Sequence, residues 1–155
     1  MRQRILSIGD DYWIEDGSGR RAFRVDGKAL RIRQTFALED AQGREVATIQ
    51  EKKLSVRDKM EIERDGKHAA TVKKALVGLR DRFSIDVAGG EDLEAKGNIV
   101  DHEYEIERGR HTVATVSKRW FAVRDTYGVE IAPGEDDALV LAVTVCIDAL
   151  SHRGE

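Results

Sequence analysis

The stretch that decides the fold is a 12-residue block that occurs three times without a gap: ATIQEKKLSVRD at 47–58, ATVKKALVGLRD at 70–81 and ATVSKRWFAVRD at 114–125. Each copy opens with Ala-Thr-Ile or Ala-Thr-Val and, after seven further residues, closes with Arg-Asp. A recurrence of this kind indicates one structural unit that is used several times. Around the last two copies the repeat is longer, because residues 60–88 align with residues 104–132 at a constant offset of 44.

The repeated unit is predicted to be a pair of short strands joined by a turn. Apolar and polar residues alternate in Glu61-Ile62-Glu63 and in its counterpart Glu105-Ile106-Glu107, which is typical of strands with one buried and one solvated face. Asp65-Gly66 and Gly109-Arg110 follow as turn signals. Similar alternation extends from Ile5 to Ile131, with further turn signals at Asp16-Gly17, Asp26-Gly27, Gln42-Gly43 and Gly89-Gly90. About a dozen short strands of this kind favour an antiparallel barrel or sandwich.

The pattern changes after Pro133-Gly134, where the strands end. Three acidic residues follow, and residues 138–150 are almost entirely apolar. Acidic residues favour a helix N-terminus, where free N–H groups present positive charge, and a helix that is apolar all round must be buried on all sides. A sheet buries such a helix only by wrapping around it. We therefore expect one mainly β domain, residues 1–155: a closed antiparallel barrel of about 12 strands over about 4–132, around a buried C-terminal hydrophobic helix over about 135–151.

Composition restricts the class of protein further. A chain of 155 residues suits a single domain with one core. The net charge is only −3, and we expect no nucleic-acid partner. The one cysteine, Cys146, rules out an intrachain disulfide and fits a reducing cytoplasm. The N-terminus lacks the apolar stretch of a signal peptide, and no segment reaches the roughly 18 apolar residues of a membrane span. We therefore expect a cytoplasmic protein without a transmembrane segment.

Several motifs occur in an order that extends over nearly the whole chain. They are Asp16-Gly17, Phe23-Arg24-Val25-Asp26-Gly27-Lys28, Leu38-Glu39-Asp40 with Gly43, the Ala-Thr-Val…Lys…Arg-Asp blocks and the terminal apolar segment. In this order they resemble the LURP-one-related family, in the tubby C-terminal-like group that also includes the phospholipid scramblases. The resemblance implies the same barrel around a C-terminal helix, and most members of the family have no assigned biochemical activity. Tubby-like relatives bind phosphoinositide headgroups through basic residues, but those residues cannot be matched one by one to positions of this sequence.

The segment 20–33 is the strongest candidate for a binding site. Its six basic residues face one acidic residue, Asp26. Near-surface cations attract anionic headgroups by about 1 kcal/mol each. We therefore predict a site for anionic phospholipid headgroups made of Arg21, Arg24, Lys28, Arg31 and Arg33. The alternative is a solvated barrel exterior, which needs charge for solubility.

No metal or cofactor site is predicted. The acidic segment 91–107 contains oxygen ligands of the kind that calcium takes. It lacks the spacing of a calcium-binding loop, so the preferred interpretation is a solvated strand face that pairs with a basic neighbour. The four histidines lack zinc spacing and are expected on the surface: His68, His102, His111 and His152. Motifs for nucleotide binding, dinucleotide binding and a nucleophilic serine are absent from the sequence.

The sequence leaves open whether four aspartates have a structural or a functional role. Asp58, Asp81 and Asp125 close the three blocks, and a role in turns is preferred because Asp readily bends the backbone. Asp148 lies in the apolar C-terminal segment, where a buried carboxylate needs a partner. An Arg or Lys of the barrel wall, or a position near the barrel mouth, would satisfy it. Cys146 is expected to be a buried structural thiol.

These observations support three hypotheses for function. The leading one is a non-enzymatic cytoplasmic barrel, peripheral to a membrane, that binds an anionic phospholipid or a membrane surface through basic residues. The alternative is a protein-interaction adaptor that uses its loops or an exposed aromatic residue such as Trp13 or Trp120. An enzyme with a site around Asp148 or the Arg-Asp corners is the third.

Overall fold

The computed structural model describes residues 4–8, 13–16, 20–29, 34–51, 59–74, 82–99, 101–118 and 127–151. These residues form twelve β-strands and one α-helix. The elements are β1 (Arg4–Ile8), β2 (Trp13–Glu15), β3 (Arg21–Ala29), β4 (Gln34–Asp40), β5 (Glu45–Glu51), β6 (Lys59–Arg64), β7 (Lys67–Lys74), β8 (Arg82–Val87), β9 (Leu93–Asn98), β10 (Glu103–Arg108), β11 (His111–Ser117), β12 (Tyr127–Ile131) and α1 (Asp137–Ser151). The predicted mainly β fold with a C-terminal helix is confirmed.

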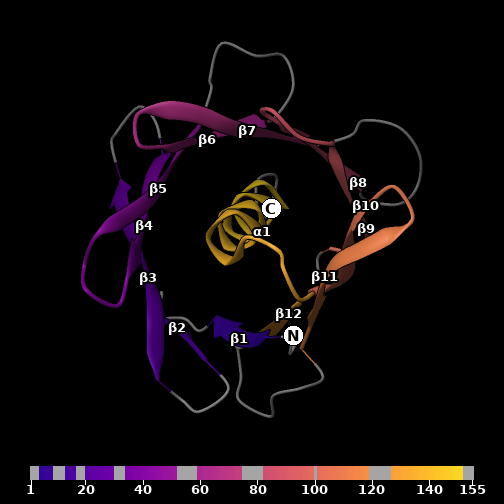
Figure 1. Ribbon diagram of the computed structural model, residues 1–155, viewed down its shortest axis with the longest axis horizontal. Helices are drawn as coiled ribbons and strands as arrows, with labels where there is room; N and C mark the ends of the chain where they lie inside the picture. Colours follow the sequence, from indigo (N-terminus) through magenta and orange to yellow (C-terminus); the bar gives the residue numbers. More distant parts are fainter. Residues whose placement is uncertain are drawn as a thin grey trace.

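The strands follow one another around a ring in which sequence neighbours pair antiparallel (Figure 1). β1 closes the ring, because it pairs with β12 along all five of its residues. On its other side it pairs with β2 through only two, Ser7 opposite Glu15 and Ile8 opposite Ile14. Each described strand therefore has a neighbouring strand on both sides, as in other closed barrels.

Helix α1 lies inside the ring (Figure 1). It begins at Asp137, slightly later than predicted, because Asp136 caps it by accepting a hydrogen bond from the N–H of Leu139 at 3.2 Å. Buried side chains surround the helix axis: Ala138, Val140, Leu141, Ala142, Val143, Thr144, Val145, Cys146, Ile147 and Leu150. They pack against the inward residues of the strands in one core. Among the described residues, no helix is both long and apolar enough to cross a bilayer.

Cys146 lies in this core, as predicted, and has no exposed surface. Burial raises the pKa of its thiol well above the ordinary value. A thiol without thiolate character is a poor nucleophile, so Cys146 serves packing.

The three copies of the block begin at the same place in three hairpins, β4–β5, β6–β7 and β10–β11. In each hairpin the register shifts just beyond the pair made by the first Ala of the block. The shifts fall between Leu38 and Glu39, between Ile62 and Glu63, and between Ile106 and Glu107. In two of the hairpins the bulged residue is hydrogen-bonded to the residue that follows the next strand in the sequence. The carbonyl of Ala69 accepts a hydrogen bond from the N–H of Ala88, and the carbonyl of Val113 accepts one from the N–H of Ala132, both at 2.9 Å. The repeat is therefore a hairpin, as predicted. The Arg-Asp ends of the blocks, with Asp58, Asp81 and Asp125, lie outside the described residues.

One predicted turn is wrong. Asp26-Gly27 lies inside β3, where Asp26 pairs with Ala37 and Gly27 with Phe36 of β4. The ladder between these two strands is continuous from Phe23 to Ala29, and this cross-strand pairing outweighs the local turn preference of Asp-Gly. The predicted turns at 42–43, 65–66, 89–90 and 109–110 are found.

The two ends of the barrel carry different elements. The end at which α1 begins, called the entry end, also carries the turns 41–44, 65–66, 88–92 and 109–110. α1 finishes at the opposite end, where β10 and β12 begin. Segments far apart in the sequence therefore meet at each end.

Candidate functional site

The predicted headgroup site falls on β3, one strand of the barrel wall. Arg21 and Arg24 are exposed there. Arg24 lies opposite Glu39 of β4, with 3.8 Å between a guanidinium nitrogen and a carboxylate oxygen, and its side chain remains 48% exposed. The backbone of Lys28 belongs to the same strand. The structure therefore places three of the five predicted residues on one continuous strand.

The three positions lie in a line along the strand and do not surround a common point. Arg21 and Lys28 are seven residues apart on β3, a distance of about 23 Å along an extended strand. Arg21 lies toward the entry end and Lys28 toward the opposite end, so the two cannot contact one small headgroup together. Arg31 and Arg33 follow β3 in the sequence but lie outside the described residues.

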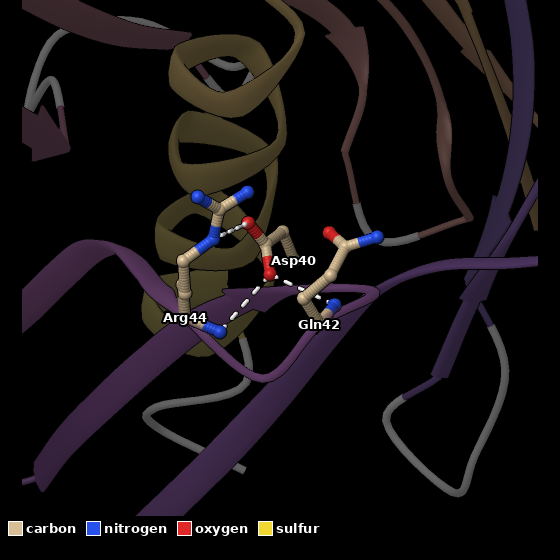
Figure 2. A network of polar contacts seen from close by, with 3 residues as sticks. All are labelled: Asp40, Gln42 and Arg44. Carbon is tan, nitrogen blue, oxygen red and sulfur yellow. Dashed lines mark hydrogen bonds and ion pairs between the residues drawn. The ribbon is translucent and has the colours of Figure 1, made fainter.

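Two aspartates at the entry end of the barrel, Asp16 after β2 and Asp40 at the end of β4, make the same kind of backbone contact. The carboxylate of Asp40 accepts hydrogen bonds from the N–H groups of Gln42 and Arg44, at 2.9 and 3.0 Å, and from Nε of Arg44 at 3.1 Å (Figure 2). Between β2 and β3, Asp16 accepts a hydrogen bond from the N–H of Arg20 at 3.0 Å. The backbone N–H of Arg44 contributes most to holding the pKa of Asp40 below its ordinary value. Both segments have the sequence Asp-x-x-Gly-Arg, a pattern from which this shared contact could be predicted.

Acidic residues of the segment 91–107 occupy a different part of the wall, on β9 and β10. Two of them form ion pairs with basic neighbours, Arg82–Glu94 at 3.6 Å and Lys96–Glu107 at 3.4 Å. A third pair, Lys73–Asp86 at 2.7 Å, joins β7 to β8 on the same wall. These contacts support the interpretation of a solvated face with basic neighbours. In the part of the chain that the structure describes, no three His, Cys, Asp or Glu side chains are placed to hold a metal ion.

Two hollows lie on this wall, one of about 460 Å³ over β9–β11 and one of about 470 Å³ over β8–β10. The first includes Gly97, where a Cβ atom would lie 2.7 Å from the carbonyl oxygen of Glu103. The Glu103 carboxylate accepts hydrogen bonds from Oγ of Ser117, at 2.9 and 3.1 Å, and from the N–H of Lys118 at 3.0 Å. Ser117 is only 4% exposed, so this contact fastens β10 to β11.

A polar cluster lies inside the barrel at the end where α1 finishes. The ring of His102 stacks on Tyr127 with 4.2 Å between the ring centroids, and its Nε2 lies 3.5 Å from Oδ1 of Asp148. The hydroxyl of Tyr104 lies near Thr144 of α1. Burial raises the pKa of both tyrosines, and the nearby charge of Asp148 raises them further.

Sequence reasoning identified Asp148 but not the residues around it. The Asp148 side chain is 39% exposed, in agreement with the predicted position near the barrel mouth. The prediction that all histidines lie on the surface is wrong for His102, whose side chain is 13% exposed, because β10 brings it against α1. His68 and His111 are exposed as predicted, and His152 lies outside the described residues.

The internal repeat contains a signal for this cluster. At the offset of 44, Tyr104 and Tyr127 align with Met60 and Phe83, which are fully buried in the core. The second copy therefore has hydroxyl groups at two core positions where the first copy has apolar side chains.

Comparison with known proteins agrees with this fold. A family model described as LURP-one-related matches residues 1–148. The X-ray structure of a protein from Arabidopsis thaliana is similar to this chain, with a TM-score of 0.73 and 18% sequence identity over 96% of this chain and 91% of that chain. At this identity the likeness shows the fold alone. No curated protein matches the chain.

Proposed function

Because the chain belongs to the LURP-one-related family, we propose that it is a non-enzymatic barrel that binds an anionic phospholipid surface through the basic residues of segment 20–33. The observation that carries this proposal is the exposure of Arg21 and Arg24 on the outer face of β3. The resemblance to tubby-like lipid binders supports it. The proposal includes a cytoplasmic location, peripheral to a membrane.

The filled interior favours a surface function over a carrier or an enzyme. Barrels that carry small molecules hold them in the lumen, and here α1 occupies that space with fully buried side chains such as Leu141, Val143 and Ile147. Contacts with a partner are therefore expected on the outer wall or at the ends of the barrel.

The number of cations sets the expected strength of binding. A cation near an anionic bilayer contributes about 1 kcal/mol, so five cations contribute at most about 5 kcal/mol, or a Kd on the order of 0.2 mM. Glu39 lies close to Arg24 and reduces this figure. Binding should therefore be weak, reversible and sensitive to salt.

Co-sedimentation with vesicles tests the proposal. The protein is mixed with phosphatidylserine-rich vesicles and with neutral phosphatidylcholine vesicles, from about 50 mM to about 500 mM salt. We expect binding to the anionic vesicles at low salt and its loss at high salt. The triple variant R21A/R24A/K28A should lose most of the binding. The matched control K73A/R82A removes two cations from β7 and β8 and should bind like the unmodified protein.

Two outcomes contradict the proposal. Absence of binding to anionic vesicles at low salt removes the lipid function, and equal losses in the two variants remove the assignment to β3. In the first case the adaptor hypothesis becomes the leading one. The hollows over β8–β11 are then the surface to test for a protein partner. Trp13 lies in β2, but its side chain and the whole of Trp120 lie outside the described residues.

A further inference from the structure

Strand β3 and strand β9 lie on opposite sides of the ring. In the strand order, six steps separate them in either direction, and Figure 1 shows them across α1 from each other. A ring of this many strands, spaced about 4.8 Å apart and tilted, is roughly 20–25 Å wide between opposite backbones.

The two sides carry different charge. Residues 82–107, which contain β8, β9 and most of β10, include eight acidic and two basic residues. Residues 13–45, which contain β2, β3 and β4, include six acidic and seven basic residues. Two of those acidic residues, Glu39 and Asp40, already contact Arg24 and Arg44. Segment 82–107 therefore carries a net charge of −6 and segment 13–45 a net charge of +1, and Arg21 and Arg24 of β3 are exposed on the second side.

We propose that the barrel binds side-on to an anionic bilayer, with β3 toward the headgroups and β8–β10 turned toward water, and that it contacts many singly charged lipids instead of one polyphosphate headgroup. This inference rests on the proposed function and specifies how it operates. It follows from the geometry of β3, whose basic residues extend along about 23 Å of strand. A line of that length matches a plane of distributed charge, whereas a single headgroup needs several cations around one point.

The separation of the two sides explains how a chain of net charge −3 can bind an anionic surface. The Debye length is about 10 Å at 0.1 M salt, so acidic residues on the far wall are screened when β3 faces the bilayer. Turned the other way, the same carboxylates would lie against the headgroups and be repelled. The charge distribution therefore selects one orientation.

Two variants that each introduce one exposed cysteine test the orientation. Gln42 is exposed in the turn after β4, the strand that pairs with β3. Ser84 is exposed on β8, and Cys146 is buried, so a dye reacts at the introduced position. An environment-sensitive dye is attached to Q42C or to S84C, and phosphatidylserine vesicles are added at low salt. We expect the emission of the dye at position 42 to shift and that of the dye at position 84 to stay unchanged. Equal shifts, or a shift at position 84 alone, overturn the orientation.

Vesicle composition and a soluble competitor test whether the barrel contacts many lipids or a single headgroup. Vesicles with phosphatidylserine and vesicles with a polyphosphoinositide are compared at equal total charge, and inositol trisphosphate is added as competitor. We expect similar binding to both vesicles and no displacement by the soluble headgroup. Binding to the polyphosphoinositide vesicles alone, with displacement, overturns the inference in favour of a single-headgroup site.

Charge variants distinguish a failure of the proposed lipid binding from a failure of the side-on orientation. R21A/R24A should weaken binding by roughly 10- to 30-fold, as the loss of two near-surface cations predicts. E94Q/E105Q, on the far wall, should change it less than about twofold. Failure of the unmodified protein to bind any anionic vesicle contradicts the proposed function. Binding that strengthens markedly in E94Q/E105Q contradicts only the side-on orientation.

Discussion

Arg64 and Arg108 hold adjacent carboxylates of one segment, although 44 residues separate the two arginines in the sequence. Arg64 bonds to Asp136, and Arg108 donates two hydrogen bonds to Glu135, at 3.0 and 2.8 Å. The arginines are equivalent positions of the repeat, each at the end of the first strand of its hairpin. Asp136 also caps α1. Both copies of the repeat therefore converge on the start of the helix that the barrel encloses.

The Arg108–Glu135 contact should stabilise the fold measurably. Its geometry is bidentate, and both side chains are largely covered, with 31% and 18% exposed. A charge-assisted pair of this kind contributes about 1–3 kcal/mol before solvent screening, so we expect R108A and E135A each to lower the free energy of unfolding by about 1–2 kcal/mol. Urea denaturation of the single and double variants gives the coupling energy. R110A, on an exposed neighbour, is the control, and additive losses in the double variant would refute the contact.

The Arg108–Glu135 contact also predicts that the protein loses stability at acid pH. Hydrogen bonding from Arg108 holds the pKa of Glu135 below its ordinary value, against an opposing effect of burial. A carboxyl whose pKa is lower in the folded state contributes stability above its unfolded pKa, about 4.3, and this contribution is lost as the pH falls through the folded pKa. The urea midpoint should therefore drop below about pH 4.3, and E135Q should show a smaller drop. An equally large drop of the urea midpoint at acid pH in E135Q would show that other carboxylates cause the loss of stability.

Gly97 should tolerate no side chain. Its φ is +135°, and a Cβ atom would lie 2.7 Å from the carbonyl oxygen of Glu103 and 2.8 Å from Cα of Tyr104. Both atoms belong to the backbone of β10, so neither can move without disturbing the ladder. We expect G97A to cost several kcal/mol in the free energy of unfolding. G90A is the matched control, because a Cβ there meets only Val87 Cγ1 at 3.5 Å, and thermal melting that affects both variants equally would contradict this account.

The two tyrosines of the polar cluster should contribute unequally to the free energy of unfolding. Y104F removes a hydroxyl that lies near Thr144 of α1, at an expected cost of about 1 kcal/mol. The first-copy counterpart of Tyr127 is Phe83, which is buried in the core without a hydroxyl. Y127F should therefore change the free energy of unfolding by less than about 0.5 kcal/mol. A loss in Y127F as large as that in Y104F would mean that both hydroxyls hold α1.

Local sequence patterns predict much of the fold and little of the site. The hairpin turns at 65–66 and 109–110 and the buried helix are predicted correctly, because alternation and apolar runs are properties of neighbouring residues. Asp26-Gly27 is predicted wrongly, since its conformation depends on pairing with Ala37 and Phe36 of the next strand. His102 is misplaced for a similar reason: its burial depends on Asp148, in an element 46 residues further along the sequence.

The sequence by itself determined that this protein is a repeated β-hairpin followed by a helix that must be buried, because period and hydrophobicity act over a few residues at a time. Only the tertiary structure decided which charges meet. The order of the strands around α1 brings Arg64 and Arg108 to the same segment and sets β3 opposite β9. Electrostatic interactions depend on distance through space, and the closed ring makes that distance unrelated to separation along the chain.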